Sequence, residues 1–296
     1  MSSRSQFIPL LSIIGATMLM ASAGVFIKLA AVPAPLMSWF RTAVPLVALT
    51  IFYLLSGHRR PGKPSALILL GSFLNAVRLL LLFAGYLFTS VSNGIMILYS
   101  WPVFATLFGA LFLKERIPLR NVFLLLLAFA GIGVVYSQSG FAIESRDFIG
   151  MSMLLISSAL YSLTVIAFKA ASLRYDQIAT TFYQNLVPAL LFTPALFFWP
   201  FPTGSSLAYA SLYAVLIGLV AFLLFFTALK HLPASVTAHL SYLEVFGALA
   251  LSVLVLGETL SWNKLVGGAM ILLSVLFVSR GNQNKGGEDQ KTEADI

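Results

Sequence analysis

Two ionisable side chains and one amide interrupt apolar stretches of this sequence where a polar group is costly. Asn75 and Arg78 are three residues apart near the middle of one stretch, so they share adjoining parts of one helix face. Glu244 lies near the middle of another. A charge at the centre of a membrane-spanning helix costs roughly 2.5–3.5 kcal/mol, so such groups normally face a cavity or a partner. We expect Arg78 and Glu244 to approach each other, directly or through a ligand whose carboxylate and ammonium they bind. A structural ion pair, or an arginine that extends to the membrane surface, is the alternative.

Aromatic residues are the second group of candidates, because their faces suit both apolar and cationic parts of a ligand. Tyr99 and Trp101 lie beside Pro102, deeper in their stretch than an interfacial belt residue, which favours a place in a cavity wall. Trp39 is near the start of its stretch, with Arg41 close by. Trp and Tyr are enriched at membrane interfaces, so an interfacial position is the alternative for Trp39.

Several further polar or aromatic residues add hydrogen-bonding capacity to such a cavity. His239 precedes Tyr242 by three residues and can relay protons or bind a ligand, although a histidine that only packs is equally consistent. The remaining candidates are Tyr161, Tyr183 and Asn185.

Three prolines are candidate hinges. Pro45 and Pro188 occupy equivalent places in two halves of the sequence, and Pro102 follows Trp101. A proline inside a helix removes a backbone donor and favours a kink. Matched kinks suit helices that pivot, although prolines that merely shape the bundle are equally consistent.

The composition identifies the solvent that these elements meet. Hydrophobic residues make up 59% of the 296 residues and charged residues only 9%, whereas soluble domains carry about 25% charged residues. The net charge of +8 is spread between hydrophobic stretches and forms no basic face, which argues against nucleic-acid binding. The three histidines lack metal-ligand spacing, and there is no cysteine and no phosphate-binding glycine motif. We therefore predict no enzyme activity, no cofactor and no metal.

Hydrophobic stretches separated by breakers predict an all-α membrane bundle of ten transmembrane helices. About 20 mainly apolar residues are needed to cross a bilayer. The first stretch imitates a signal peptide but continues far enough to span, so we expect it to be retained. Every second loop is basic, which places both termini in the cytoplasm. The predicted spans are 7–31, 36–56, 65–88, 93–113, 120–137, 148–171, 177–199, 207–229, 235–256 and 262–279.

An internal repeat relates the two halves. At an offset of 143 residues Pro45 aligns with Pro188, Tyr99 with Tyr242 and Glu115 with Glu258. Each half holds five helices, an odd number, so the second half must be inverted, and the basic loops of one half align with loops of the other that lack their cations. The domains are then residues 1–140, residues 141–280 and a disordered cytoplasmic tail over 281–296. Many secondary transporters have this architecture, with the substrate near the midplane.

Two short motifs carry a resemblance to a known family. Tyr242-Leu243-Glu244-Val245 and Leu256-Gly257-Glu258 resemble motifs of the ten-helix EamA-type exporters in the drug/metabolite transporter superfamily, although Val245 stands where proline is usual. The resemblance covers residues 7–280 and is greatest to YddG-type exporters of aromatic amino acids. It implies export of small amphipathic metabolites, most of all aromatic or hydrophobic amino acids, by alternating access.

The resemblance and the basic loops also predict where the protein lies and what it contacts. We expect a multi-pass protein of the inner membrane, a monomer or weak homodimer, that binds a small molecule and contacts the lipid bilayer. A nucleotide-sugar or phosphate-ester exchanger and a multidrug or cation exporter are the alternatives, and a channel or scramblase is a further one. Phosphate chemistry would favour several deep cations, whereas only Arg78 is clearly deep in the sequence.

Overall fold

The structure, a computed structural model, describes residues 3–56, 62–113, 119–137, 142–171, 174–175, 177–231, 240–274 and 276–277. All regular structure within these ranges is helical. The helices are α1 (Ser3–Ala21), α2 (Ala23–Ala30), α3 (Ala34–Leu55), α4 (Ala66–Phe88), α5 (Val91–Leu98), α6 (Trp101–Leu113), α7 (Leu119–Tyr136), α8 (Arg146–Ala171), α9 (Gln177–Phe192), α10 (Ala195–Phe198), α11 (Gly204–Leu212), the π-helix η2 (Tyr213–Ala221), α12 (Phe222–His231) and α14 (Leu243–Leu256). A last helix covers residues 262–274.

These helices fit the ten predicted spans, of which residues 235–239, 275 and 278–279 lie outside the described ranges. Within the described residues, seven helical stretches are long and apolar enough to cross a membrane, and α14 is a shorter apolar helix of 14 residues. Large apolar side chains cover the outside of the bundle: Phe123, Leu254 and Phe197 are 65%, 81% and 84% exposed. Water tolerates such a surface poorly, whereas lipid accommodates it. The chain is a multi-pass membrane protein.

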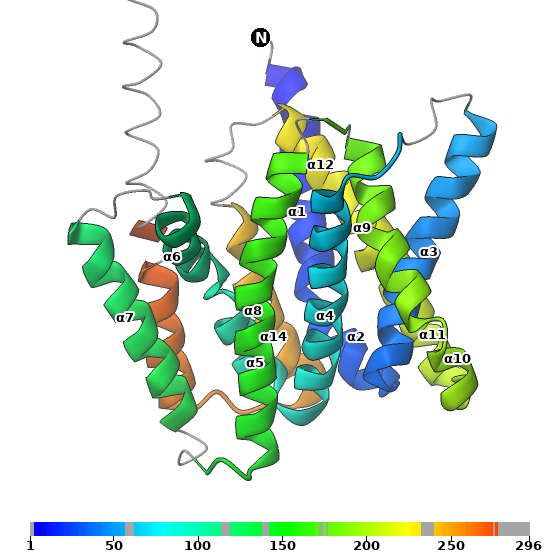
Figure 1. Cartoon of the computed structure of the whole chain (residues 1–296). Helices are drawn as coiled ribbons and strands as arrows, with labels where there is room; N and C mark the ends of the chain where they lie inside the picture. The colour runs from blue at the N-terminus through cyan, green and yellow to red at the C-terminus, as the bar shows by residue number, and fades with distance from the viewer. Residues whose placement is uncertain are drawn as a thin grey trace, which may run out of the picture.

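Close helix packing at the centre of the bundle depends on small residues. Figure 1 shows α4 and α8 side by side there. A Cβ on Gly85 would lie 2.9 Å from the carbonyl oxygen of Gly150, and a Cβ on Gly150 would lie 2.7 Å from the backbone nitrogen of Thr89. Only glycine permits this approach, which is the usual way that membrane helices gain packing contacts.

The same device joins α7 to the last helix. A Cβ on Gly131 would lie 2.7 Å from the Gly267 carbonyl oxygen, and one on Gly267 would lie 2.6 Å from that of Gly131. The Ser274 hydroxyl also donates to the Leu124 carbonyl at 2.5 Å. Elsewhere α3 packs against α9, α1 against α12 and η2, and α5 against α14. The bundle therefore brings together helices that are far apart in the sequence.

Candidate functional site

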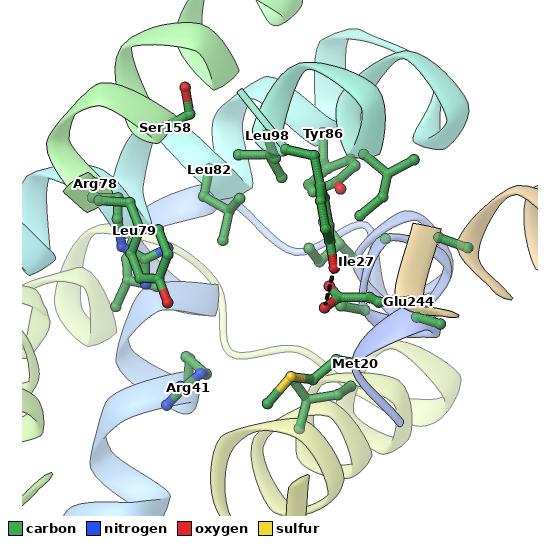
Figure 2. A pocket seen from close by; sticks show the side chains of 18 of the residues that line it. Met20, Ile27, Arg41, Arg78, Leu79, Leu82, Tyr86, Leu98, Ser158 and Glu244 are labelled. Carbon is green, nitrogen blue, oxygen red and sulfur yellow. Dashed lines mark hydrogen bonds between the residues drawn. The ribbon is translucent and has the colours of Figure 1, made fainter. Parts of the chain in front are cut away.

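A cavity of about 200 Å³ lies inside the bundle and is lined by residues of α1 to α6, α8, η2, α12 and α14 (Figure 2). Apolar side chains form much of its wall, as in most small-molecule sites, and a few polar groups converge on it. We call it the central cavity. Its polar and aromatic lining residues are Arg41, Arg78, Tyr86, Tyr99, Trp101, Ser158, Tyr161, Tyr213, Phe222 and Glu244.

Irregular stretches of helix surround this cavity. The chain breaks between α1 and α2 at Ser22, between α5 and α6 at Tyr99-Ser100, and at Tyr242 just before α14. The π-helix η2 contributes Tyr213 to the wall. Non-helical backbone at membrane depth is tolerated where it is buried in protein or lines a cavity, and π-helical segments are frequent at functional sites. The backbone geometry therefore marks the same place as the polar side chains.

Arg78 on α4 is one of two cations in the wall. Its Nε and Nη2 donate to Asn75 Oδ1 at 3.2 and 3.1 Å. Its guanidinium lies 4.8 Å from the ring centroid of Tyr161, within cation–π range. These contacts fix the orientation of the guanidinium without neutralising its charge.

Arg41 on α3 is the second cation and is only 6% exposed. Its Nη1 donates to Asn185 Oδ1 at 3.5 Å, and its guanidinium lies 4.9 Å from the ring centroid of Phe222. Tyr213 lines the same wall of the cavity. Neither Arg41 nor Arg78 forms an ion pair with any carboxylate of the described residues.

Glu244 supplies the acid, from the first turn of α14. The Tyr99 hydroxyl lies 3.0 Å from Glu244 Oε2 and 2.8 Å from the carbonyl oxygen of Ser241, and donates to these acceptors. Figure 2 shows Glu244 on one side of the cavity and both arginines on the other. Arg78 and Glu244 therefore face one cavity but do not touch.

The cavity wall has an excess of one positive charge, since two guanidinium groups oppose one carboxylate. Removing a charge from water costs several kcal/mol unless a partner compensates it. The polar contacts of Arg41 and Arg78 are all with neutral groups. This arrangement suits a ligand that brings its own negative charge.

Five of the predicted site residues line the central cavity, and two others support it from behind. The five are Arg78, Glu244, Tyr99, Trp101 and Tyr161. Asn75 and Asn185, 2% and 3% exposed, lie behind the arginines rather than in the wall. Each also donates a hydrogen bond to the backbone of α9. Asn75 Nδ2 donates to the Gln184 carbonyl at 3.2 Å, and Asn185 Nδ2 donates to the Thr181 carbonyl at 2.8 Å.

The remaining predicted residues lie elsewhere. The Tyr183 hydroxyl donates to the Gly62 carbonyl, and its ring packs on Tyr175 and Phe182, away from the cavity. Trp39 packs edge-on against Phe40 outside the cavity wall. Tyr242 lies 5.9 Å from Tyr99, centroid to centroid, and lines a separate apolar groove between α14 and the last helix. His239 lies outside the described residues.

The three prolines predicted as hinges occupy different settings. Pro45 and Pro188 lie inside α3 and α9, both of which continue past them. Pro102 is the second residue of α6, directly after the break at Tyr99-Ser100. A proline is tolerated in the first turn of a helix because its missing donor is not needed there. Pro102 thus marks a break in the backbone, whereas Pro45 and Pro188 do not.

Sequence reasoning missed Arg41 as a site residue, because its place near the start of α3 resembles the membrane surface. One available signal was the internal register, which places Arg41 opposite Gln184 and beside the position of Asn185. Polar residues at the same depth of two apolar helices indicate a shared cavity.

Among the described residues, no group of three or more His, Cys, Asp or Glu could hold a metal ion.

Solved structures support this fold. One crystal structure, 19% identical in sequence, matches with a TM-score of 0.61 over 93% of this chain and 96% of its own. At that identity the match speaks for the architecture alone.

Curated relatives and a family match identify the class. The chain is 25% identical over 225 residues to an uncharacterized transporter of Archaeoglobus fulgidus, covering 75% of this chain and 79% of that protein. It is 27% identical over 191 residues to the uncharacterized transporter YvbV of Bacillus subtilis, covering 62% of this chain and 61% of YvbV. The EamA-like transporter family matches residues 7–137 and 148–280. With nearly the whole bundle matched, this chain belongs to the EamA-like transporter family.

Proposed function

We propose that this membrane transporter exports small amphipathic metabolites, foremost amino acids with aromatic or hydrophobic side chains, by alternating access. The central cavity carries the proposal. It presents guanidinium groups on one side, a carboxylate on the other and aromatic rings around them (Figure 2). An amino acid matches this arrangement, with its carboxylate toward Arg78, its ammonium toward Glu244 and its side chain against Tyr161 and Trp101.

Several features support an inverted repeat as the machinery. Tyr99 and Tyr242, aligned by the 143-residue register, each occupy a helix break, and their rings pack together. In the same register, α4 is equivalent to the η2–α12 segment and α8 is equivalent to α1. The contact of α4 with α8 and the equivalent contact of η2–α12 with α1 are both present. In an inverted repeat the substrate site lies where the halves meet, and the halves rock about it. The basic loops support a location in the inner membrane with both termini in the cytoplasm.

A second candidate is an exchanger of organic phosphates or nucleotide sugars. Arg41 favours it, because a second deep cation is what a phosphate would need. Glu244 in the same wall opposes it, because a phosphate ester carries about −1.5 to −2 charges at neutral pH. We therefore place amino acids first.

Reconstitution tests the proposal. Purified protein in liposomes is loaded in turn with labelled phenylalanine, a nucleotide sugar or an organic cation, and efflux is measured with and without a pH gradient. Efflux of phenylalanine that Arg78→Ala abolishes and Glu244→Ala reduces is expected, and Arg120→Ala, at an exposed arginine near the start of α7, serves as the matched control. Exchange of the phosphate ester alone would refute the amino-acid assignment.

A further inference from the structure

We propose that Arg41 and Arg78 form a single clamp for one carboxylate, so that the carboxylate is the indispensable group of the substrate and the ammonium is dispensable. This inference rests on the proposed transport site and names the chemical class that the site selects. It assigns Arg41 a role as a second ligand of the same anion.

The donors of the two guanidinium groups support the clamp. Arg78 has five N–H groups and uses Nε and Nη2 on Asn75, which leaves three N–H groups with no acceptor among the described residues. Arg41 bonds Asn185, and its remaining N–H groups also lack an acceptor there. Both side chains line the same cavity and lie on the side of it that faces Glu244 (Figure 2). Free donors from two guanidinium groups thus converge on one enclosed space.

Both guanidinium groups are held in place before any ligand arrives. Each has an amide oxygen on one edge, from Asn75 or Asn185, and an aromatic ring against its face, from Tyr161 or Phe222. A planar guanidinium fixed in this way offers a rigid fork that matches a carboxylate. Asn75 and Asn185 are therefore positioning residues: they act on the substrate through the arginines.

The charge of the cavity makes the two ends of an amino acid unequal. A carboxylate removes the excess of one positive charge, whereas an ammonium alone would raise the number of cations to three against one acid. Glu244 already accepts a hydrogen bond from Tyr99, so it does not require an ammonium partner. A monoanion is also favoured over a phosphate ester, which would leave the cavity with negative charge beside Glu244.

A matched set of ligands tests the clamp. Four probes share one phenyl ring and differ in charge: 3-phenylpropionate has only the carboxylate, phenethylamine only the ammonium, L-phenylalanine both, and phenyl phosphate a phosphate. Binding to the purified full chain is measured from the rise of the thermal unfolding midpoint with ligand concentration. We expect 3-phenylpropionate and L-phenylalanine to bind, and phenethylamine and phenyl phosphate to bind at least about 10-fold more weakly, the effect of about 1.4 kcal/mol in binding free energy.

Variants show whether both arginines take part. Arg41→Ala and Arg78→Ala should each weaken the binding of 3-phenylpropionate at least about 10-fold, since each removes charged hydrogen bonds. Arg41→Lys, which keeps the charge but loses the fork, covers the case in which the alanine variant fails to fold, and should also weaken it. Arg120→Ala should leave binding unchanged.

The outcomes separate the clamp from the transport proposal. Equal binding of phenethylamine and 3-phenylpropionate, tighter binding of phenyl phosphate, or unchanged binding by both Arg41 variants overturns the clamp. Failure of every probe to bind, while liposomes still export amino acids, also overturns it and leaves the proposed function intact. Binding of 3-phenylpropionate that depends on Arg41, with no amino-acid transport, supports the clamp and overturns the proposed function.

Discussion

Buried and half-buried charges gather in two regions of the described protein, and their surroundings differ. In the central cavity Arg41 and Arg78 have only neutral partners. The second region, which we call the α5 cap cluster, lies where α5 begins. Its members are Thr89, Ser90, Val91, Ser92, Asn93, Asp147, Glu258 and Lys264.

The α5 cap cluster satisfies its charges from within the protein. Glu258 accepts from the backbone N–H groups of Val91 and Ser92 at 2.6 and 2.9 Å, and from the Ser92 hydroxyl at 2.7 Å. Lys264 Nζ donates to the Ser92 hydroxyl at 3.0 Å and to the Thr259 carbonyl at 3.1 Å. Asp147 accepts from Thr89 and Asn93. A carboxylate at a helix N-terminus is stabilised by the free N–H groups and the helix dipole.

The difference between the regions indicates their purpose. Charges whose partners all come from the protein hold parts of it together, and here residues after α14 and at the start of α8 are tied to the turn between α4 and α5. The N–H groups of Arg41 and Arg78 that face the central cavity have no acidic partner in contact, and this suits the ligand site proposed above. Substitutions in the two regions should therefore have opposite consequences for stability and for transport.

The largest expected effect is on transport, from Arg78→Ala. Loss of two charged hydrogen bonds to the substrate, about 1.5–3 kcal/mol each, predicts a fall of roughly 10²–10⁴-fold in uptake efficiency. The thermal unfolding midpoint should change little, because removing an uncompensated charge relieves desolvation. Uptake of labelled phenylalanine and thermal unfolding are measured on the same preparation. A large loss of stability without a loss of transport would contradict the comparison.

Glu258→Ala should give the opposite result. It removes three hydrogen bonds to a charged group and leaves the N-terminus of α5 uncapped, so we expect a loss of about 2–4 kcal/mol of stability. Thermal unfolding in detergent measures this loss. Glu144→Ala, at an exposed loop position before α8, is the control and should have no effect.

Accessibility of the central cavity should also depend on the α5 cap cluster, if that cluster keeps one end of the bundle closed. The sequence has no cysteine, so Ser158→Cys in the cavity wall is a unique reactive site. When Glu258→Gln is added to Ser158→Cys, a membrane-impermeant maleimide supplied on the side of the membrane nearest the α5 cap cluster should modify the introduced thiol about 10-fold faster. That factor corresponds to a change of about 1.4 kcal/mol in the opening equilibrium. Equal rates in the two variants would show that the cluster does not control access.

Gly257 connects the family motif to the α5 cap cluster, and its substitution should have a moderate effect. Gly257 ends α14 with φ +66°, and its own N–H bonds the Val253 carbonyl at 3.1 Å, the αL arrangement of a helix C-terminus. This turn directs Glu258 toward α5. Gly257→Ala should cost about 1–2 kcal/mol of stability, the penalty of a left-handed conformation for a residue with a Cβ. Thermal unfolding measures the loss. Gly133→Ala in α7, where a Cβ meets no atom within 4 Å, should cost nothing comparable.

Much of the fold follows from the sequence, because hydropathy and breakers determine where helices cross the bilayer. The breaks inside helices do not, since η2 and the turn at Ser22 depend on neighbouring helices. Depth along a hydrophobic stretch identified Arg78, Tyr99 and Glu244. It failed for Arg41 because α3 begins inside the protein, where Leu36 and Met37 are 0% and 1% exposed, so the start of that helix is not at the membrane surface.

The roles of Asn75 and Asn185 could not be predicted from the sequence, and a comparison of the two gives the smallest expected effects. An amide side chain binds a ligand or a neighbouring residue equally well, and only the positions of Arg78 and Arg41 in the structure show that the two asparagines bind the arginines. Asn75 accepts two hydrogen bonds at 3.1 and 3.2 Å, whereas Asn185 accepts one at 3.5 Å. Asn75→Ala should therefore raise the KM for phenylalanine more than Asn185→Ala, about 30-fold against about fivefold, at about 1 kcal/mol per hydrogen bond. Both should leave kcat nearly unchanged, because the arginines remain. Equal effects of the two variants would mean that the asparagines support the packing of α9 rather than the orientation of the guanidinium groups.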